Sequence, residues 1–282
     1  MGFVKAKVEN INEAAKREAT SSTGKRGVPS QFFSISPDTT SRIRILPPWT
    51  AEGENANLPF KKIYQHWDVG PESKRSICPA KMTNGRERCY ICEQIEEMKR
   101  TGDDKRASRM RAGRRFVFQL IDRDDPVWHS MDDAVKDDPN LLGKPKIKLY
   151  SGPYSVQKDL VDLYNSVDWG DVCDPFEGVD LDLKRTGAGL KTEYKLTPTR
   201  WNTPIFSKDG TRDEPDMDMI NAVAEMMYDL DEHPFFRTDS FEVTYEKWEG
   251  VPYEGEVAPV SDKPEDQPNW RNQPPRMGDV PF

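Results

Sequence analysis

Residues 66–92 read HWDVGPESKRSICPAKMTNGRERCYIC, and this stretch carries the most specific pattern in the chain. Three cysteines and a histidine lie within 27 residues with the spacing H-x11-C-x10-C-x2-C; they are His66, Cys78, Cys89 and Cys92. A C-x2-C turn aims two thiolates at one point, and Zn²⁺ favours four tetrahedral nitrogen and sulfur ligands. The pattern therefore predicts one structural zinc ion, held by a closed ligand set that leaves no position for a substrate.

The alternative interpretation of this stretch is a group of unpaired core thiols beside a surface histidine. The fourth cysteine, Cys173, lies far along the chain and outside the cluster. No H-x-E precedes a P-C-x2-C, as zinc nucleobase deaminases require, and there is no H-E-x2-H. His129 and His233 are isolated in the sequence, so we expect them to be structural or solvated.

The composition indicates a compact core with solvated ends. Of the 282 residues, 35% are hydrophobic and 32% are charged, whereas an average globular domain is about 45–50% apolar. No run of about 18 apolar residues is present, so no membrane-spanning helix is expected. The first residues, MGFVKAKVENINEAAKREA, lack the apolar stretch of a secretory signal. We therefore expect a cytoplasmic protein, whose cysteines are thiols or metal ligands rather than disulfides.

The charge is distributed unevenly along the chain. Residues 1–123 carry 24 Lys and Arg against 15 Asp and Glu, whereas residues 124–282 carry 17 against 34. A basic front half with an acidic end suggests a site for a polyanion and a tail that competes for it. The alternative is an acidic tail that only keeps the protein soluble.

The pattern along the chain predicts three regions. Residues 1–30 end in a Ser/Thr/Gly stretch and are expected to form a flexible N-terminal arm. Residues 31–249 form the core, in which the zinc subdomain occupies about residues 60–112. Residues 250–282 are Pro-, Asp- and Glu-rich without a period, which predicts a disordered acidic C-terminal tail.

Alternating apolar residues predict several short strands. The predicted strands are Ser41–Leu46, Arg115–Ile121, Lys146–Tyr150, Val179–Lys184 and Glu193–Leu196. The predicted helices are Cys89–Arg111, Val156–Tyr164 and Met217–Leu230. Short strands with few helices favour a mainly β protein with helical insertions, of the α+β class, built as a small closed or partly open barrel.

A basic run in the first half suggests a nucleic-acid surface. Lys99–Arg115 holds eight basic residues against two acids and leads directly into Phe116 and Phe118. Cations track a phosphate backbone while aromatic rings stack on any base, so together they bind single strands with little sequence preference. The alternative is a solvated helix face beside core aromatics. The candidate DNA-binding residues are Arg42, Arg44, Lys61, Lys62, Tyr64, Trp67, Lys105, Arg106, Arg109, Arg111, Arg114, Arg115, Phe116, Phe118, Lys146, Lys148, Tyr150, Tyr154 and Tyr194.

The chain resembles a known family, the T-even-type phage single-stranded DNA-binding (helix-destabilising) proteins. The similarity covers roughly residues 31–250, and the order and spacing of His66, Cys78, Cys89 and Cys92 are its most specific part. It also includes the segments RIRILP (42–47), FEGVDLDLK (176–184), VAEMMYDLDEHPFF (223–236) and FEVTYEKWEG (241–250).

The resemblance implies an OB-fold barrel with an inserted zinc-binding subdomain, a basic cleft for DNA, and a tail that contacts replication and recombination proteins. By position, the four Cys and His residues match the zinc ligands of that family. Arg114, Arg115 and Phe116 match its basic-aromatic approach to a central strand, and Tyr194 matches a DNA-facing aromatic. Self-association along the strand is expected less firmly, because the short basic motif at the N-terminus of that family is not reproduced here.

The C-terminus resembles a different group. The last residues, MGDVPF, are similar to the tip of bacterial single-stranded DNA-binding proteins, in which the final Phe and carboxylate dock into partner pockets. The matching partner-binding residues are Asp279, Val280, Pro281 and Phe282.

These observations predict a non-enzymatic protein that coats and protects single-stranded DNA in replication, recombination and repair. Its compartment is the cytoplasm, of an infected bacterial host if a phage encodes it. One alternative is a zinc-dependent recombination mediator or a binder of structured nucleic acid. A second is a metal-dependent nuclease, whose carboxylates would be Asp122, Asp124, Asp125, Asp132 and Asp133.

Overall fold

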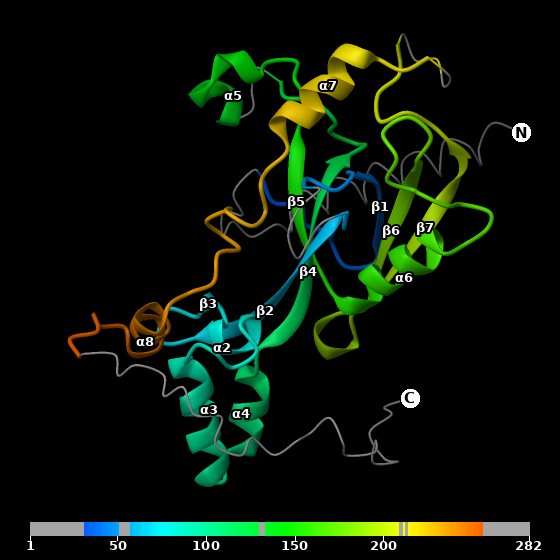
Figure 1. The fold of residues 1–282 in the computed structure, drawn as a ribbon. Helices are drawn as coiled ribbons and strands as arrows, with labels where there is room; N and C mark the ends of the chain where they lie inside the picture. Colours follow the sequence, from blue (N-terminus) through cyan, green and yellow to red (C-terminus); the bar gives the residue numbers. More distant parts are fainter. Residues whose placement is uncertain (1–30, 51–56, 130–132, 209–210, 212–213, 256–282) are drawn as a thin grey trace, which may run out of the picture. The chain divides into compact units, whose positions relative to one another are not determined.

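The strand β4 (Gly113–Asp122) pairs with three other strands in the structure, a computed structural model that describes residues 31–50, 57–129, 133–208, 211 and 214–255 (Figure 1). It runs antiparallel to β2 (Phe60–Val69), to β1 (Thr39–Ile45) and to β5 (Ile147–Gly152). The first half of β4 faces β2, the last residues face β1, and β5 lies along Phe116–Ile121.

The sheet continues from β1 into β6 (Val179–Thr186) and β7 (Glu193–Asn202), again with antiparallel pairing. Its order is β3-β2-β4-β1-β6-β7, with β3 (Lys74–Ile77) after β2 and with β5 on β4. The prediction of a mixed α+β protein with short, mostly antiparallel strands and helical insertions is thereby confirmed.

Alternating side chains explain why these segments form strands. In β6, Val179, Leu181 and Leu183 are buried while the residues between them reach the surface. The main core lies among β1, β4, β5, β6 and a helix, α6 (Tyr154–Tyr164), which begins two residues before the predicted start. In β1 the alternation fails at Arg44, whose side chain has no exposed surface. A strand with both faces covered cannot follow a simple inside–outside pattern.

The described residues form two compact units. The first combines the described residues between 31 and 65 and between 112 and 237, and the second combines residues 66–111 and 238–255. In the first unit, α7 (Met217–Met226) covers a smaller core with Ile121, Ile147 and Ile205. A short helix, α5 (Asp133–Asp137), and two 3-10 turns at Pro139–Leu141 and Gly189–Lys191 complete that unit.

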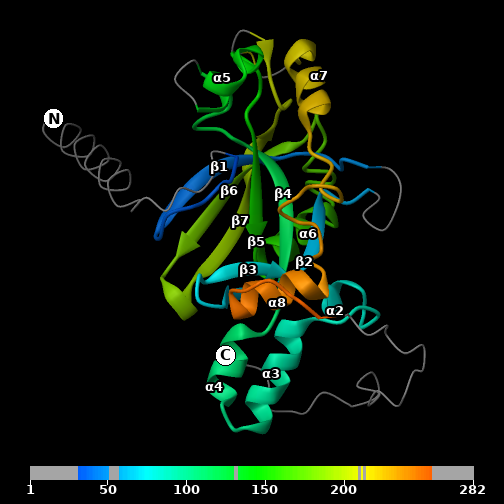
Figure 2. The same cartoon turned by 90° about the vertical axis from the view of Figure 1, so that its left-hand side faces the viewer.

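The second unit holds β3 and four helices among the described residues: α2 (Pro79–Met82), α3 (Tyr90–Arg100), α4 (Asp104–Met110) and α8 (Phe241–Glu249) (Figure 2). The prediction of one helix over Cys89–Arg111 is therefore wrong, because two helices form there. Gly102 has a left-handed backbone, and the Asp103 carboxylate caps α4 by accepting a hydrogen bond of 3.2 Å from the Arg106 amide. Such a turn and cap end one helix and begin the next.

Other boundaries also differ from the sequence pattern. The helix predicted over Met217–Leu230 ends at Met226, since Met227 has an extended backbone. The strands β2 and β3 and the helix α8 were not predicted. The predicted arm at residues 1–30 and residues 256–282 of the predicted tail lie outside the described residues, as do Asp279, Val280, Pro281 and Phe282. Within the described part, no helix has the length and apolar character needed to cross a membrane.

Candidate metal centre and cation–aromatic surface

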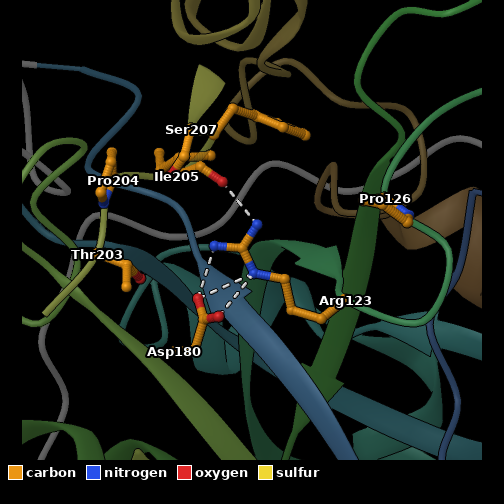
Figure 3. Close-up of a pocket in the computed structure, with 8 residues that line it drawn as sticks. Arg123, Pro126, Asp180, Thr203, Pro204, Ile205 and Ser207 are labelled. Atoms are coloured by element: carbon orange, nitrogen blue, oxygen red, sulfur yellow. Dashed lines mark hydrogen bonds and ion pairs between the residues drawn. The ribbon is translucent and has the colours of Figure 1, made fainter. Parts of the chain in front are cut away.

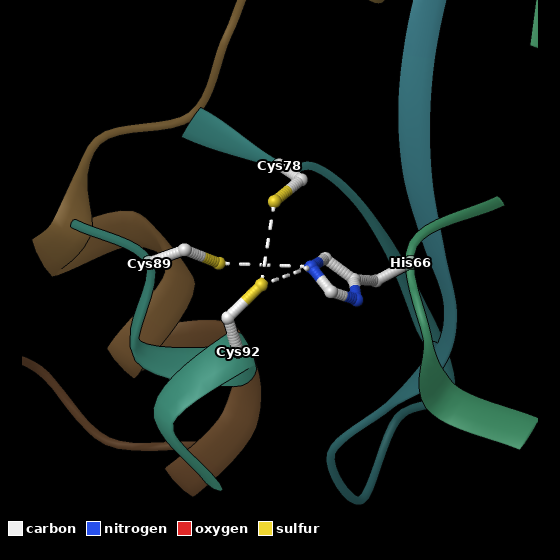
Figure 4. Close-up of side chains that lie close together, drawn as sticks. All are labelled: His66, Cys78, Cys89 and Cys92. Carbon is white, nitrogen blue, oxygen red and sulfur yellow. Dashed lines mark hydrogen bonds between the residues drawn. The ribbon is translucent and has the colours of Figure 1, made fainter. Parts of the chain in front are cut away.

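Four predicted ligands converge in the second unit (Figure 4). The ligand atoms of His66, Cys78, Cys89 and Cys92 all lie within 4.8 Å of one another, and three of the four residues are buried. His66 Nε2 lies 3.6 Å from both Cys89 Sγ and Cys92 Sγ, and Cys78 Sγ lies 3.5 Å from Cys92 Sγ. Tetrahedral zinc bonds of about 2.3 Å to sulfur and about 2.0 Å to nitrogen give edges of about 3.5–3.8 Å. The group can therefore hold a metal ion.

Local structure explains why the four side chains meet. His66 belongs to β2, and Cys78 is the N-cap of α2, where its sulfur accepts from the Lys81 amide at 3.4 Å. Cys89 is the N-cap of α3, and Cys92 lies in the first turn of that helix. Helix N-termini favour negative charge, so this position stabilises the thiolates that a metal ion binds.

The His66 ring is oriented by a backbone group. Its Nδ1 lies 2.7 Å from the carbonyl oxygen of Met110, and because a carbonyl only accepts, Nδ1 carries the proton. This bond directs Nε2 toward the cysteine sulfurs, which is the usual orientation of a metal-binding histidine.

The proton affinities of these groups depend on one another, because the four side chains interact. Hydrogen bonds from Cys89 and Cys92 lower the pKa of Cys78 far below its usual range, whereas the bonds to Cys78 and Cys92 raise the pKa of Cys89. Burial lowers the pKa of His66, but hydrogen bonds to Cys78 and Cys92 and to the Met110 carbonyl outweigh it and raise that pKa to about 10. Three sulfurs this close cannot all ionise unless a cation neutralises them.

Several candidate DNA-binding side chains are buried or engaged in ion pairs. Arg42 pairs with Asp182, Lys61 donates to the Leu230 carbonyl at 2.8 Å, Lys146 pairs with Asp125, and Lys148 pairs with Asp122. The core contains the side chains of Phe116, Phe118 and Tyr150. These side chains could contact a nucleic acid only after their present contacts break. Apart from Arg42, they expose too little surface to support the predicted direct contact.

Arg44 is held inside the first unit by the Asp180 carboxylate, which also binds Arg123, and by two backbone carbonyls. Arg44 Nη2 donates to the carbonyl oxygens of Asp174 and Thr203 at 2.9 and 2.7 Å. Arg44 Nη1 lies 3.3 Å from Asp180 Oδ1. Arg123 Nε and Nη2 donate to the same carboxylate at 2.6–3.0 Å (Figure 3). Arg123 Nη1 also donates to the Ile205 carbonyl at 2.6 Å, beside a cavity of about 340 Å³. Burial lowers the pKa of Arg44 to about 10, although the Asp180 charge opposes this shift. Nothing in the sequence indicated this arrangement.

A cation–aromatic surface lies at the β2–β4 pair of the first unit. The guanidinium of Arg114 lies 4.4 Å from the ring centre of Tyr154, which is 49% exposed, and 5.8 Å from that of Phe116. Tyr64 is opposite Arg114 and Lys62 is opposite Phe116, and directly opposed residues project from the same face of a sheet. Lys62 and Arg114 are exposed and have no carboxylate partner among the described residues.

The remaining candidates are spread over both units. In the second unit, four exposed cations follow one another on and after α4, namely Lys105, Arg106, Arg109 and Arg111. Trp67 is half-buried in β2. In the first unit, Arg115 is half-buried, and Arg185 lies 6.0 Å from the ring centre of Tyr194 on the β6–β7 pair.

The carboxylates of the nuclease alternative are engaged elsewhere. Lysines pair with Asp122 and Asp125, and the Asp122 carboxylate also accepts from the Asp124 amide at 3.1 Å. Asp132 lies outside the described residues, and the side chain of Asp133 is not described. Across the described part of the chain, the Cys and His cluster is the one group of three or more potential ligands that comes together.

No model of a known protein family matches the chain, and no curated protein matches it either. The function is therefore inferred from the chemistry of the two sites.

Proposed function

We propose that the chain is a sequence-independent single-stranded DNA-binding protein with one structural zinc ion. The carrying observation is the surface formed by Lys62, Tyr64, Arg114 and Tyr154, where an unpaired guanidinium lies over an exposed ring. A strand that crosses this surface has its phosphates neutralised by the cations and its bases stacked on the tyrosines. Stacking is tolerant of sequence because every base has a π-face.

Zinc is the proposed ion because of the donor set. Three thiolates and one imidazole match zinc, and the four donors fill its tetrahedral shell. The ion would supply a cross-link among β2, α2 and α3, which a small unit of short elements needs for stability. Because no coordination position remains for a substrate, the proposed role is structural and the proposed protein is not an enzyme.

The fold proposed for the first unit is an OB-fold-like barrel, and the second unit is the proposed zinc subdomain. The central place of β1, which pairs with both β4 and β6, supports a strongly curved antiparallel sheet. This interpretation agrees with the resemblance to T-even-type single-stranded DNA-binding proteins. That resemblance also underlies the proposed roles in replication, recombination and repair, and the proposed partners at Asp279, Val280, Pro281 and Phe282.

A binding titration with matched variants tests the proposal. Quenching of the seven tryptophans by poly-dT, poly-dA and duplex DNA should show tight binding to both single strands, weak binding to duplex and a steep dependence on salt. Replacing a stacking side chain costs about tenfold in affinity or more, so Tyr154→Ala and Arg114→Ala should bind more weakly to both single strands. Lys208→Ala, which removes an exposed cation that pairs with Glu214 outside α6 and the β2–β4 pair, is the control and should bind normally.

Other outcomes favour the alternatives. A preference for duplex or folded RNA would support the mediator or structured-nucleic-acid binder. Cleavage of either substrate in the presence of Mg²⁺ would support the nuclease. Removal of residues 256–282, which keeps Tyr253 in its ring contacts with Phe241 and Tyr245, should tighten binding at low salt if the acidic tail competes with DNA.

A further inference from the structure

The second unit contains a cavity that neither the metal centre nor the cation–aromatic surface uses. Its volume is about 280 Å³, close to the lower limit of about 300 Å³ for pockets that bind small molecules. Its lining residues come from the end of β2, the β2–β3 turn, α4 and α8, and they are Asp68, Gly70, Pro71, Arg106, Met110 and Trp248.

The lining combines three kinds of chemistry. Trp248 is half-buried and Met110 is buried, so together they offer an apolar, polarisable wall. Arg106 is exposed and has no ion-pair partner among the described residues, and the same is true of Asp68. Because this cation and carboxylate line one cavity without pairing with each other, a ligand that carries both an anion and a hydrogen-bond donor can use both groups.

The backbone fixes the two walls of the cavity. A Cβ at Gly70 would collide with the carbonyl oxygens of Lys247 and Trp248, so the close approach of this turn to the end of α8 requires glycine. Asp68 has a φ of 53°, a left-handed conformation that aspartate tolerates better than most residues. The Met110 carbonyl accepts the bond from the ligand His66, so the metal centre also holds one side of the cavity.

We propose that this cavity binds one nucleotide of a single strand and adds a preference for cytosine at that one position to binding that is otherwise independent of sequence. The base stacks on Trp248, the phosphate pairs with Arg106, and the Asp68 carboxylate accepts a hydrogen bond from the exocyclic amino group N4. Cytosine presents that amino group, whereas thymine presents a carbonyl oxygen at the same position, which a carboxylate repels. The small volume favours a pyrimidine over a purine. This inference rests on the proposed function, because the nucleotide is taken to belong to a bound single strand.

The preference is measured by calorimetric titration of the metal-loaded full-length chain with dCMP and dTMP, and with oligo-dC and oligo-dT. One charge-assisted hydrogen bond corresponds to about tenfold in affinity, so cytosine should bind about tenfold more tightly in both pairs. Asp68→Gly keeps the left-handed backbone and removes the acceptor, so it should abolish the preference. Asp68→Asn keeps the backbone as well, and its carboxamide can accept from cytosine or donate to thymine, so the preference should be strongly reduced.

A matched pair on α4 tests the phosphate contact. Arg106→Ala should weaken the binding of both mononucleotides, whereas Arg109→Ala, which changes an exposed arginine of the same helix that does not line the cavity, should leave it unchanged. Equal binding of dCMP and dTMP by the parent chain overturns the assignment, as does a preference that survives in Asp68→Gly. If oligo-dC and oligo-dT bind tightly and equally, the cavity proposal fails while the proposed function stands. If dCMP is preferred but longer strands bind no better than the mononucleotide, the proposed function fails while the cavity assignment stands.

Discussion

The backbone amide of Tyr90 donates a hydrogen bond of 3.1 Å to the hydroxyl of Thr244, a residue 154 positions further along the chain. Tyr90 lies between the ligands Cys89 and Cys92, and Thr244 is the buried residue of α8. The turn that presents two thiolates is therefore tied to a helix from the other end of the sequence. The rings of Tyr90, Phe241 and Tyr245 pack against one another at the same contact.

Thr244→Val should lower the free energy of unfolding of the second unit. Valine keeps the shape of the side chain but leaves the Tyr90 amide without its acceptor, which costs about 1–3 kcal/mol in a buried position. Urea unfolding, followed by tryptophan fluorescence, measures the difference. Thr197→Val on β7 is the control, since Thr197 is exposed. Equal stability of Thr244→Val and the parent would mean that the bond between α3 and α8 is unimportant.

Each of the four ligands should be required for stoichiometric metal. Cys92→Ser and His66→Ala should lose most of the bound ion, because a tetrahedral structural site with three protein ligands binds far more weakly. Metal content by mass spectrometry gives the answer. Cys173→Ser is the control for the loss of a thiol, since Cys173 is buried in the first unit away from the cluster. Full occupancy in Cys92→Ser would show that the fourth position belongs to another group.

Asp180→Asn should destabilise the first unit strongly. The carboxylate serves both Arg44 and Arg123, and Arg44 has no exposed side-chain surface. Removing one partner of a buried pair costs about 3–5 kcal/mol, because an uncompensated charge stays inside. Asp182→Asn breaks the exposed pair with Arg42 and should cost no more than about 1 kcal/mol. Denaturant midpoints that fall equally in the two variants would contradict the structural role of Arg44.

The contribution of His233 to stability should depend on pH. Burial, and secondarily the charge of Lys61, lowers the pKa of His233 below its ordinary value of 6.5, so the folded chain favours the neutral ring. The unfolded chain then binds more protons below pH 6.5, and stability is lost as the pH falls from 6.5 toward the folded pKa. His233→Asn keeps an acceptor for the Phe235 amide, which donates to Nδ1 at 3.3 Å, and removes the titration.

The measurement is the difference in free energy of unfolding between the parent and His233→Asn from pH 7.5 to 5. Any advantage of the parent should shrink as the pH falls below 6.5, whereas Thr197→Val, at an exposed position without a titratable group, should show no such trend. The parent and His233→Asn keep the same candidate metal ligands. Any release of a bound ion at low pH therefore lowers the stability of both proteins equally. A constant difference across the range would show that His233 does not titrate between the two states.

The sequence predicted the convergence of the Cys and His cluster better than the surroundings of the candidate cations. The four ligands lie within 27 residues, so their spacing alone restricts where they can meet. The alternating strands were found wherever one face is apolar and the other polar, as in β6. The break between two helices at Gly102 was not predicted, because basic residues continue on both sides of it. Glycine followed by an Asp N-cap is nevertheless a sequence signal for the end of one helix and the start of another.

The features that the sequence did not predict depend on contacts between residues that are far apart in the chain. The alternating pattern predicted that the side chains of Arg44 and Lys61 face the solvent. In the structure both are buried, because Arg44 pairs with Asp180 and Lys61 donates to the Leu230 carbonyl. The helix α8 has a weak pattern, and its place against α3 follows from tertiary packing of Tyr90, Phe241 and Tyr245. Asp68 and Trp248 line one cavity only because Gly70 permits a close backbone approach.

The order of synthesis gives the second unit two stages of assembly. A ribosome that has completed residue 92 has already delivered every metal ligand, while the helix that completes the unit, α8, is about 150 residues away from being made. A nascent chain that binds the proposed ion can thus do so through a local segment, and Thr244 joins the unit later. The same separation means that a truncated chain ending before residue 238 would carry the ligands but lack the helix that packs on them.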